Sequence, residues 1–334
     1  MLRKIQPGLV KLIWPLLALG VVLLYDVFYV PGFFHIEMRE GHLYGSLVDI
    51  LKNAAPFALL ALGMTLVLAT KGVDLSVGAV MAVAGAVAAV LVTREHPPPI
   101  IVIFGLALVA ALLCGVWNGL LVAWLDIQPI VATLILMVAG RGIAQLLADG
   151  QIITFENKAF EFVDGGFLFG IPVPIFIALA ALLIVGALTR LTALGLFIEA
   201  VGDNPEASRY TGVPTRLVKV MVYAVCGVCA GVAGLIATSS IKGADASNVG
   251  LTYELDAILA TVIGGTSLNG GRFFLVGSVL GAILLQTLTT TIQTSNIKPE
   301  YNLVVKAVVI VVVCVLQSEV VRRKLAGLRR GGAQ

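Results

Sequence analysis

Charged side chains are scarce in this chain. They make up 12% of its 334 residues, whereas soluble globular domains carry about 25%. Hydrophobic residues make up 59%, and the mean hydropathy is +1.03. This composition excludes an ordinary soluble domain and predicts an all-α polytopic membrane protein, because apolar segments of about 20 residues cross a bilayer as helices. The net charge of only +3 argues against a nucleic-acid partner.

Sequence motifs for nucleotide binding and catalysis are absent as well. There is no G-x-x-x-x-G-K-[ST] segment, so the chain is not expected to bind ATP through a P-loop. Neither H-E-x-x-H nor G-x-S-x-G occurs, and the only histidines, His35, His42 and His96, fall in expected outside loops. We therefore predict that the chain is not an enzyme and carries no catalytic residue, metal ligand or bound cofactor.

Cysteine is also sparse, and the four cysteines all fall in apolar runs. Cys226 and Cys229 form a C-x-x-C pair, a spacing that redox and metal sites use. Glycine and alanine flank the pair, and no second pair or histidine is near it in the sequence. This context favours small residues that pack a membrane helix.

The apolar runs predict about ten membrane helices in a single domain that covers residues 1–334. Two runs are short, and 255–268 cannot cross about 30 Å of hydrocarbon as a straight helix at 1.5 Å per residue. We expect one or two helices to be short or broken. The run 255–268 would be broken by the glycines of "VIGGTSLNGGR". The runs lie at about 8–30, 54–70, 75–93, 100–125, 127–148, 167–189, 217–238, 255–268, 272–294 and 302–318.

The distribution of lysine and arginine predicts that both termini are cytoplasmic. With ten crossings, 14 of the 22 basic residues fall inside, six outside and two within spans. This bias fits the positive-inside rule. It places the loop 190–216 and a basic C-terminal tail, 319–334, in the cytoplasm.

A charged turn, "TKGVDLS" at 70–76, separates two runs that contain no charge. It is either a tight turn at the membrane surface or broken backbone that lines a polar cavity. In the first interpretation Lys71 reaches lipid headgroups, and an ionised Asp74, or Ser76, caps the helix that begins near Leu75. The sequence leaves both interpretations open.

Few polar side chains fall inside the predicted spans. Arg141 and Gln145 are four residues apart and share a helix face, so they form either part of a pathway or a tie between helices. Asp26 lies near a span end and is expected to reach the interface. The candidate pathway or gating residues are Asp74, Ser76, Asn118, Arg141, Gln145 and Gln286.

Glycines at a spacing of four indicate close helix packing. The pairs Gly115–Gly119, Gly227–Gly231 and Gly277–Gly281 each form G-x-x-x-G. Such pairs let helix backbones approach closely in a membrane. They predict a compact bundle and do not identify a cargo.

The loop 190–216 contains signals for a separate short helix. Asn204 is a good N-cap, and Pro205 suits the first helical position. Gly212 can adopt the left-handed conformation that ends a helix. We expect a helix from about Pro205 to Thr211, and a capped helix between two spans favours a docking element over a solvated connector. Its exposed side is expected to carry Ala207, Tyr210 and Thr211.

Four segments together resemble the permease subunits of bacterial ABC sugar importers of the ribose/galactofuranose type. They are "GMTLVLATKGVDLSVGAVMAVAGA", "IQPIVATLILMVAGRGIAQ", "GLFIEAVGDNPEASRYTGV" and "LDAILATVIGGTSLNGGRF", and the resemblance covers about residues 45–318. One departure is visible, because the family usually reads Gly-Gly-hydrophobic-Asp-Leu-Ser and Lys71 stands here in place of the first glycine.

The resemblance implies the ten-helix fold of the larger type of ABC importer in the bacterial inner membrane. It implies three partners: a second permease subunit, a cytoplasmic ATPase that uses ATP and Mg²⁺, and a periplasmic sugar-binding protein. The short cytoplasmic helix would be the coupling helix that sits on the ATPase. The residues assigned to this coupling region are Glu199, Gly202, Asn204, Pro205, Ala207, Arg209, Tyr210 and Gly212.

A secondary transporter driven by an ion gradient is the alternative function. Such a protein uses carboxylates inside the membrane to couple protons or sodium ions. Outside the short run 255–268, only Asp26 falls within a predicted span, near its end. The scarcity of carboxylates favours the ABC permease.

Overall fold

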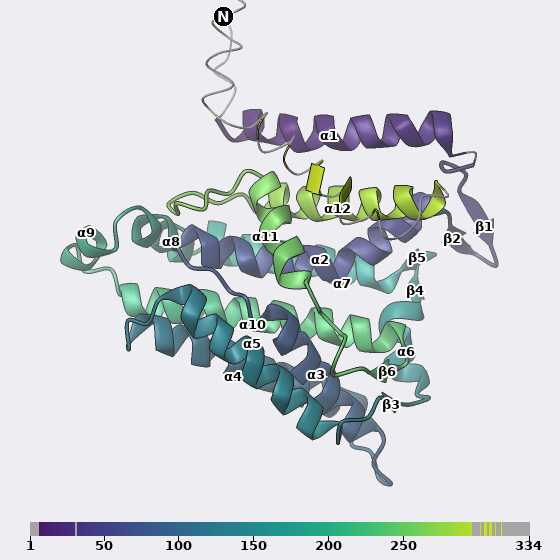
Figure 1. The fold of residues 1–334 in the computed structure, drawn as a ribbon, viewed down its shortest axis with the longest axis horizontal. Coiled ribbons are helices and arrows are strands. Elements are labelled where there is room, and N and C mark those ends of the chain that lie inside the picture. Colours follow the sequence, from purple (N-terminus) through teal and green to yellow (C-terminus); the bar gives the residue numbers. More distant parts are fainter. Residues whose placement is uncertain are drawn as a thin grey trace, which may run out of the picture.

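The computed structural model describes residues 7–30 and 32–295, together with Tyr301 and a few positions between 304 and 315. Over this range the protein is a layered helical bundle in which the long helices run roughly side by side (Figure 1). The predicted span 302–318 lies largely outside the described residues, and the tail 319–334 lies wholly outside them.

Within the described residues, seven helices are long and apolar enough to cross a membrane. A polytopic membrane fold is therefore confirmed, whereas the count of ten stays a prediction. The seven are α1 (Pro7–Tyr29), α2 (Ser46–Ala69), α4 (Ile100–Ala123), α5 (Pro129–Leu147), α7 (Val173–Arg190), α10 (Thr215–Ser240) and α12 (Leu275–Thr294).

The remaining elements are short. The apolar helix α3 (Val77–Val92) and the helix α11 (Tyr253–Ile263) are too short to cross about 30 Å alone. The other helices are α6 (Lys158–Gly165), α8 (Leu194–Asp203) and α9 (Pro205–Tyr210). Three antiparallel strand pairs complete the fold: β1 (Glu37–Arg39) with β2 (His42–Tyr44), β3 (Ile153–Thr154) with β6 (Gly243–Ala244), and β4 (Phe167–Leu168) with β5 (Ile171–Pro172).

Helix α2 forms the centre of the bundle. It packs against α10 on one side and α12 on the other, and α7 and α11 also contact it (Figure 1). Its residues from Ala58 to Ala69 are all buried. At about 1.5 Å per residue its 24 residues span about 36 Å, so α2 connects the two ends of the bundle.

The start of α2 differs from the prediction. The helix begins at Ser46, whereas the apolar run begins at Ala54. Polar residues of its first turns interrupt the hydropathy pattern but not the helix. Lys52 is accommodated because its Nζ lies 2.9 Å from Oδ2 of Asp164 at the end of α6, so the charge of this half-buried lysine is paired.

Asp26 of α1 also differs from the prediction. Its side chain does not reach the interface, because it is fully buried against α12. There its Oδ2 accepts a hydrogen bond of 2.9 Å from Oγ1 of Thr291. This bond holds α1 against α12.

The predicted close packing at glycines is confirmed. A Cβ added to Gly115 of α4 would collide with the backbone of α10 at Tyr223, and one added to Gly227 would collide with the backbone of α4. Cys226 and Cys229 are free, buried thiols within α10, in agreement with their interpretation as packing residues.

Gly277→Val is predicted to destabilise the protein, because Gly277 of α12 lies directly against the carbonyl oxygen of Gly264 after α11. Overpacking of this kind costs about 1–3 kcal/mol. Gly186→Val is the matched control, since Gly186 of α7 faces open space. Thermal unfolding of the purified protein should show a lower midpoint for Gly277→Val only. Equal midpoints for the two variants would contradict the packing that we describe.

Candidate functional site

Helix α9 is capped as predicted. Oδ1 of Asn204 accepts a hydrogen bond of 3.0 Å from the backbone N–H of Ala207. Pro205 occupies the first position, and Gly212 has a φ of +86°, the left-handed conformation that glycine adopts without strain. The helix ends at Tyr210, one residue earlier than predicted, and Thr211 is its C-cap.

Helix α9 projects from one end of the bundle (Figure 1). Ala207, Tyr210 and Thr211 are exposed as predicted, and Tyr210 has 91% of its surface exposed. Ser208 is buried on the opposite side. The structure thus presents a small helix face, with an aromatic ring, that covers nothing within the described chain.

The helix before α9 is fixed tightly to the end of α2. A side chain at Gly202 of α8 would collide with the carbonyl oxygen of Ala69, so the two backbones are in contact. The same carbonyl accepts a hydrogen bond of 2.9 Å from the N–H of Gly271, in the loop after α11. Three segments therefore meet at the last turn of α2: α8, the turn 70–76 and the glycine-rich loop.

Lys71 adds a bond to this junction. Its Nζ donates to the carbonyl oxygen of Asp203 at a distance of 2.8 Å. The expectation that this side chain reaches lipid headgroups is therefore wrong. Its φ is +62°, which costs a non-glycine residue roughly 1–2 kcal/mol. A glycine adopts this backbone without that cost. Lys71 carries the backbone strain, and its side chain forms a hydrogen bond to α8 that glycine could not form.

Asp74 does not cap α3. That helix begins at Val77, and Ser76 at the N-cap position makes no side-chain capping bond. Instead Oδ1 of Asp74 accepts from the backbone N–H of Ser76 at 2.9 Å and from its Oγ at 2.6 Å. The capping prediction is wrong because Asp74 lies two residues before the N-cap, where its carboxylate closes the turn.

Asp74, Ser76 and Asn118 form one buried polar cluster. Nδ2 of Asn118 on α4 donates to Oγ of Ser76 at 2.8 Å and to Oδ1 of Asp74 at 3.4 Å. All three residues are at most 1% exposed. The cluster thus joins the turn between α2 and α3 to α4 in the interior, and it lines none of the cavities described below.

Arg141 and Gln145 of α5 lie together, as the spacing predicts. Nη1 of Arg141 donates to the carbonyl oxygens of Ala246 and Val249, at 3.1 and 2.6 Å. Nε2 of Gln145 donates to Oγ of Ser247 at 3.3 Å. These are the contacts of a tie between α5 and the loop before α11, and a pathway role stays a prediction.

Gln286 lies apart from the other candidates, in a cavity at the end of the bundle opposite α9. Residues near the first turns of α2 and the last turns of α10 and α12 line this cavity. Sequence reasoning missed its other side chains. The signal that could have found them is the recurrence of amides, with Asn53 and Gln293 at span ends and Asn248 in the loop before α11.

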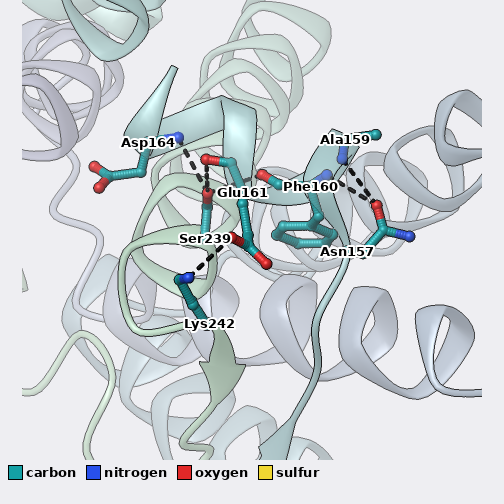
Figure 2. A network of polar contacts seen from close by, with 7 residues as sticks. All are labelled: Asn157, Ala159, Phe160, Glu161, Asp164, Ser239 and Lys242. Atoms are coloured by element: carbon teal, nitrogen blue, oxygen red, sulfur yellow. Dashed lines mark hydrogen bonds and ion pairs between the residues drawn. The ribbon is translucent and has the colours of Figure 1, made fainter.

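Helix α6 lies at this end of the bundle (Figure 1), and polar contacts join it to Ser239 and Lys242 (Figure 2). Oγ of Ser239, near the end of α10, donates to the carbonyl oxygen of Phe160 at 2.8 Å and accepts from the N–H of Asp164 at 3.0 Å. Nζ of Lys242 lies 2.9 Å from Oε2 of Glu161. This bond raises the pKa of the Lys242 ammonium group. Both ends of α6 are thus held on α10.

The candidate membrane spans of the bundle define a multi-pass membrane protein. Residues 46–314 match the family model described as the branched-chain amino acid transport system / permease component. Because the match covers most of the chain, the protein belongs to this permease family. Of the residues predicted for the coupling helix, Arg209 lies on α9, whereas Glu199 and Gly202 lie on the preceding helix α8. Their role in coupling stays a prediction.

Curated relatives match almost the whole chain. The galactofuranose transporter permease protein YtfT of Escherichia coli (strain K12) is 51% identical over 95% of this chain and 94% of its own length. The fructose import permease protein FruF of Bifidobacterium longum is 39% identical over 96% and 91%. The ribose import permease protein RbsC of Haemophilus influenzae is 36% identical over 88% and 89%. No solved structure matches the chain.

Asp74→Asn is predicted to preserve stability, because asparagine keeps the acceptor oxygen that Ser76 and Asn118 use. Asp74→Ala leaves these buried donors without that acceptor, at a cost of about 1–3 kcal/mol for each unsatisfied group. Thermal unfolding should therefore separate the alanine variant from both the asparagine variant and the wild type. If Asp74→Asn unfolds as early as Asp74→Ala, the negative charge is needed and hydrogen bonding alone does not explain the cluster.

Proposed function

We propose that this chain is the permease subunit of an ABC importer that moves a monosaccharide of the ribose, galactose or galactofuranose class across the bacterial inner membrane. The single observation that carries the coupling mechanism is the capped, outward-facing helix α9. The names of the relatives, a galactofuranose transporter permease and two import permeases for fructose and ribose, support the sugar class.

The energy for transport would come from a separate ATPase subunit. The sequence has no P-loop, so ATP and Mg²⁺ would be used by that partner and this chain would be non-catalytic. The face of α9 formed by Ala207, Tyr210 and Thr211 would seat in a groove of the ATPase. The remaining partners are a second permease subunit and a periplasmic sugar-binding protein.

Helix α2 offers a route for coupling. A movement of α9 would displace α8, because only Asn204 separates the two helices. Helix α8 would carry α2 with it, through the contact of Gly202 with Ala69 and the bond from Lys71 to Asp203. The other end of α2 lines the cavity that holds Gln286. ATP binding at one end could in this way change the shape of the opposite end.

This mechanism requires a definite orientation. The α9 end, with the starts of α1 and α10, would be cytoplasmic, and both termini would be cytoplasmic. The end with α6 and the cavity would face the periplasm and the binding protein. Helix α6 is suited to a docking role, because its bonds to Ser239 and Lys242 hold it rigidly on the bundle.

Ala207→Asp is predicted to abolish uptake and co-purification with the ATPase. The new carboxylate would be buried without a partner at the interface, at a cost of several kcal/mol. Ala159→Asp is the matched control for co-purification with the ATPase, because Ala159 is also exposed but lies on α6 at the opposite end. Both variants should insert and fold normally. If Ala207→Asp keeps uptake and co-purification at the wild-type level, α9 is not the coupling element.

Cysteine labelling in intact cells is predicted to give opposite results at the two ends. Lys158→Cys, at the start of α6, should react with a membrane-impermeant maleimide added outside. Arg209→Cys on α9 should react only after the membrane is made permeable. Labelling of the wild-type chain measures the background reaction of its native cysteines. Labelling of position 209 from outside would reverse the proposed orientation.

A further inference from the structure

The cavity opposite α9 has a volume of about 510 Å³, within the range of small-molecule sites. It lies among α2, α10, α11, α12 and the loop between β6 and α11. Its lining combines aromatic rings, amides and hydroxyl groups, with three charged side chains. The polar lining residues named below come from five different segments, so the fold assembles them and no local motif encodes them.

Each charged side chain of the lining already has a partner within the chain. Lys52 pairs with Asp164 at 2.9 Å. Asp245 accepts hydrogen bonds from the backbone N–H groups of Ser247 and Asn248, both at 3.1 Å, and from Nδ2 of Asn248 at 2.7 Å. These bonds lower the pKa of the Asp245 carboxyl, and the bond from the Asn248 side chain has the largest effect. A charged ligand would have to break these pairs to find its own partner.

The neutral part of the lining has two components. Phe57 of α2 and Tyr253 of α11 pack against each other with ring centroids 4.5 Å apart, and they form one aromatic wall. Amide side chains of Asn53, Gln286 and Gln293 line the same cavity and bring both donors and acceptors.

We propose that this cavity is a transit site that binds one neutral monosaccharide between its release by the binding protein and its passage through the membrane. A sugar ring has an apolar C–H face, which suits the aromatic wall, and hydroxyl groups that both donate and accept, which suit amides. A zwitterionic amino acid would bury two charges among groups that are already paired, which is costly. This proposal rests on the proposed function and deepens it by locating the substrate.

The position of the cavity couples it to α9. Phe57, Asn53 and Pro56 belong to α2, whose other end contacts α8. Pro56 lacks an N–H group, so it removes one backbone hydrogen bond from α2 beside the cavity. A change in the tilt of α2 would move Phe57 relative to Tyr253, and with it the aromatic wall of the site.

Cysteine protection in the assembled permease–ATPase complex tests the transit site. Gln293→Cys places an exposed thiol in the cavity, and its rate of reaction with a maleimide is measured in lipid nanodiscs without the binding protein. D-galactose, D-ribose and D-fructose are tested at millimolar concentration, with L-leucine as the zwitterionic comparison. We expect at least one sugar to slow labelling several-fold and L-leucine to have no effect. Phe169→Cys, at a site 97% exposed outside the cavity, should react at the same rate throughout.

A second substitution tests the aromatic wall. Tyr253→Ala in the Gln293→Cys chain should abolish protection by the sugar, whereas Tyr44→Ala, on strand β2 away from the cavity, should leave it intact. Absence of protection by every sugar, equal protection by L-leucine, or protection that survives Tyr253→Ala would overturn the transit site.

Uptake by the complete importer separates this proposal from the proposed function. If the wild-type importer accumulates a sugar of the panel but Gln293→Cys is never protected, the transit site is wrong and the proposed function stands. If the wild-type importer accumulates none of the sugars, the proposed function itself fails for this panel, and the transit site fails with it.

Discussion

The close contact of helix backbones around α2 is the constraint on which the rest of the structure depends. In a bilayer, apolar side chains gain little from leaving lipid for protein, so helices associate through tight packing and internal hydrogen bonds. Gly63 of α2 lies directly against Cys226 of α10, and Gly202 of α8 against the end of α2. Because these contacts leave no space for a methyl group, α2 cannot move without its neighbours.

Buried polar groups in this tightly packed bundle bond from one helix or turn to a neighbouring segment. Asp26, Asp74 and Arg141 lie on different helices or turns, and each bonds to a neighbouring segment. None of the three lines the cavity that contains Gln286. In the described part of the chain, their bonds serve to join helices, whereas the lining of the cavity opposite α9 includes neutral amides and two aromatic rings.

The two ends of the bundle differ in the side chains that they present. At one end α9 presents an exposed tyrosine and small side chains, a surface that another protein can cover. At the other end the charges of Lys52, Asp164 and Asp245 are paired or hydrogen-bonded within the chain. Helix α2 runs between these ends, so it connects the proposed ATPase surface with the proposed sugar site.

Local signals in the sequence were sufficient for the membrane class, for most helix positions and for α9, since hydropathy, Asn204, Pro205 and Gly212 act through near neighbours. Tertiary structure alone decided the partners of the polar groups. Lys52 extends α2 because Asp164 pairs with it, and Lys71 bonds to Asp203 instead of reaching lipid. Tertiary structure also decided the cavity, because Asn53, Tyr253 and Gln286 meet only after three helices pack. Long-range partners leave no periodicity in a sequence, so only the fold reveals them.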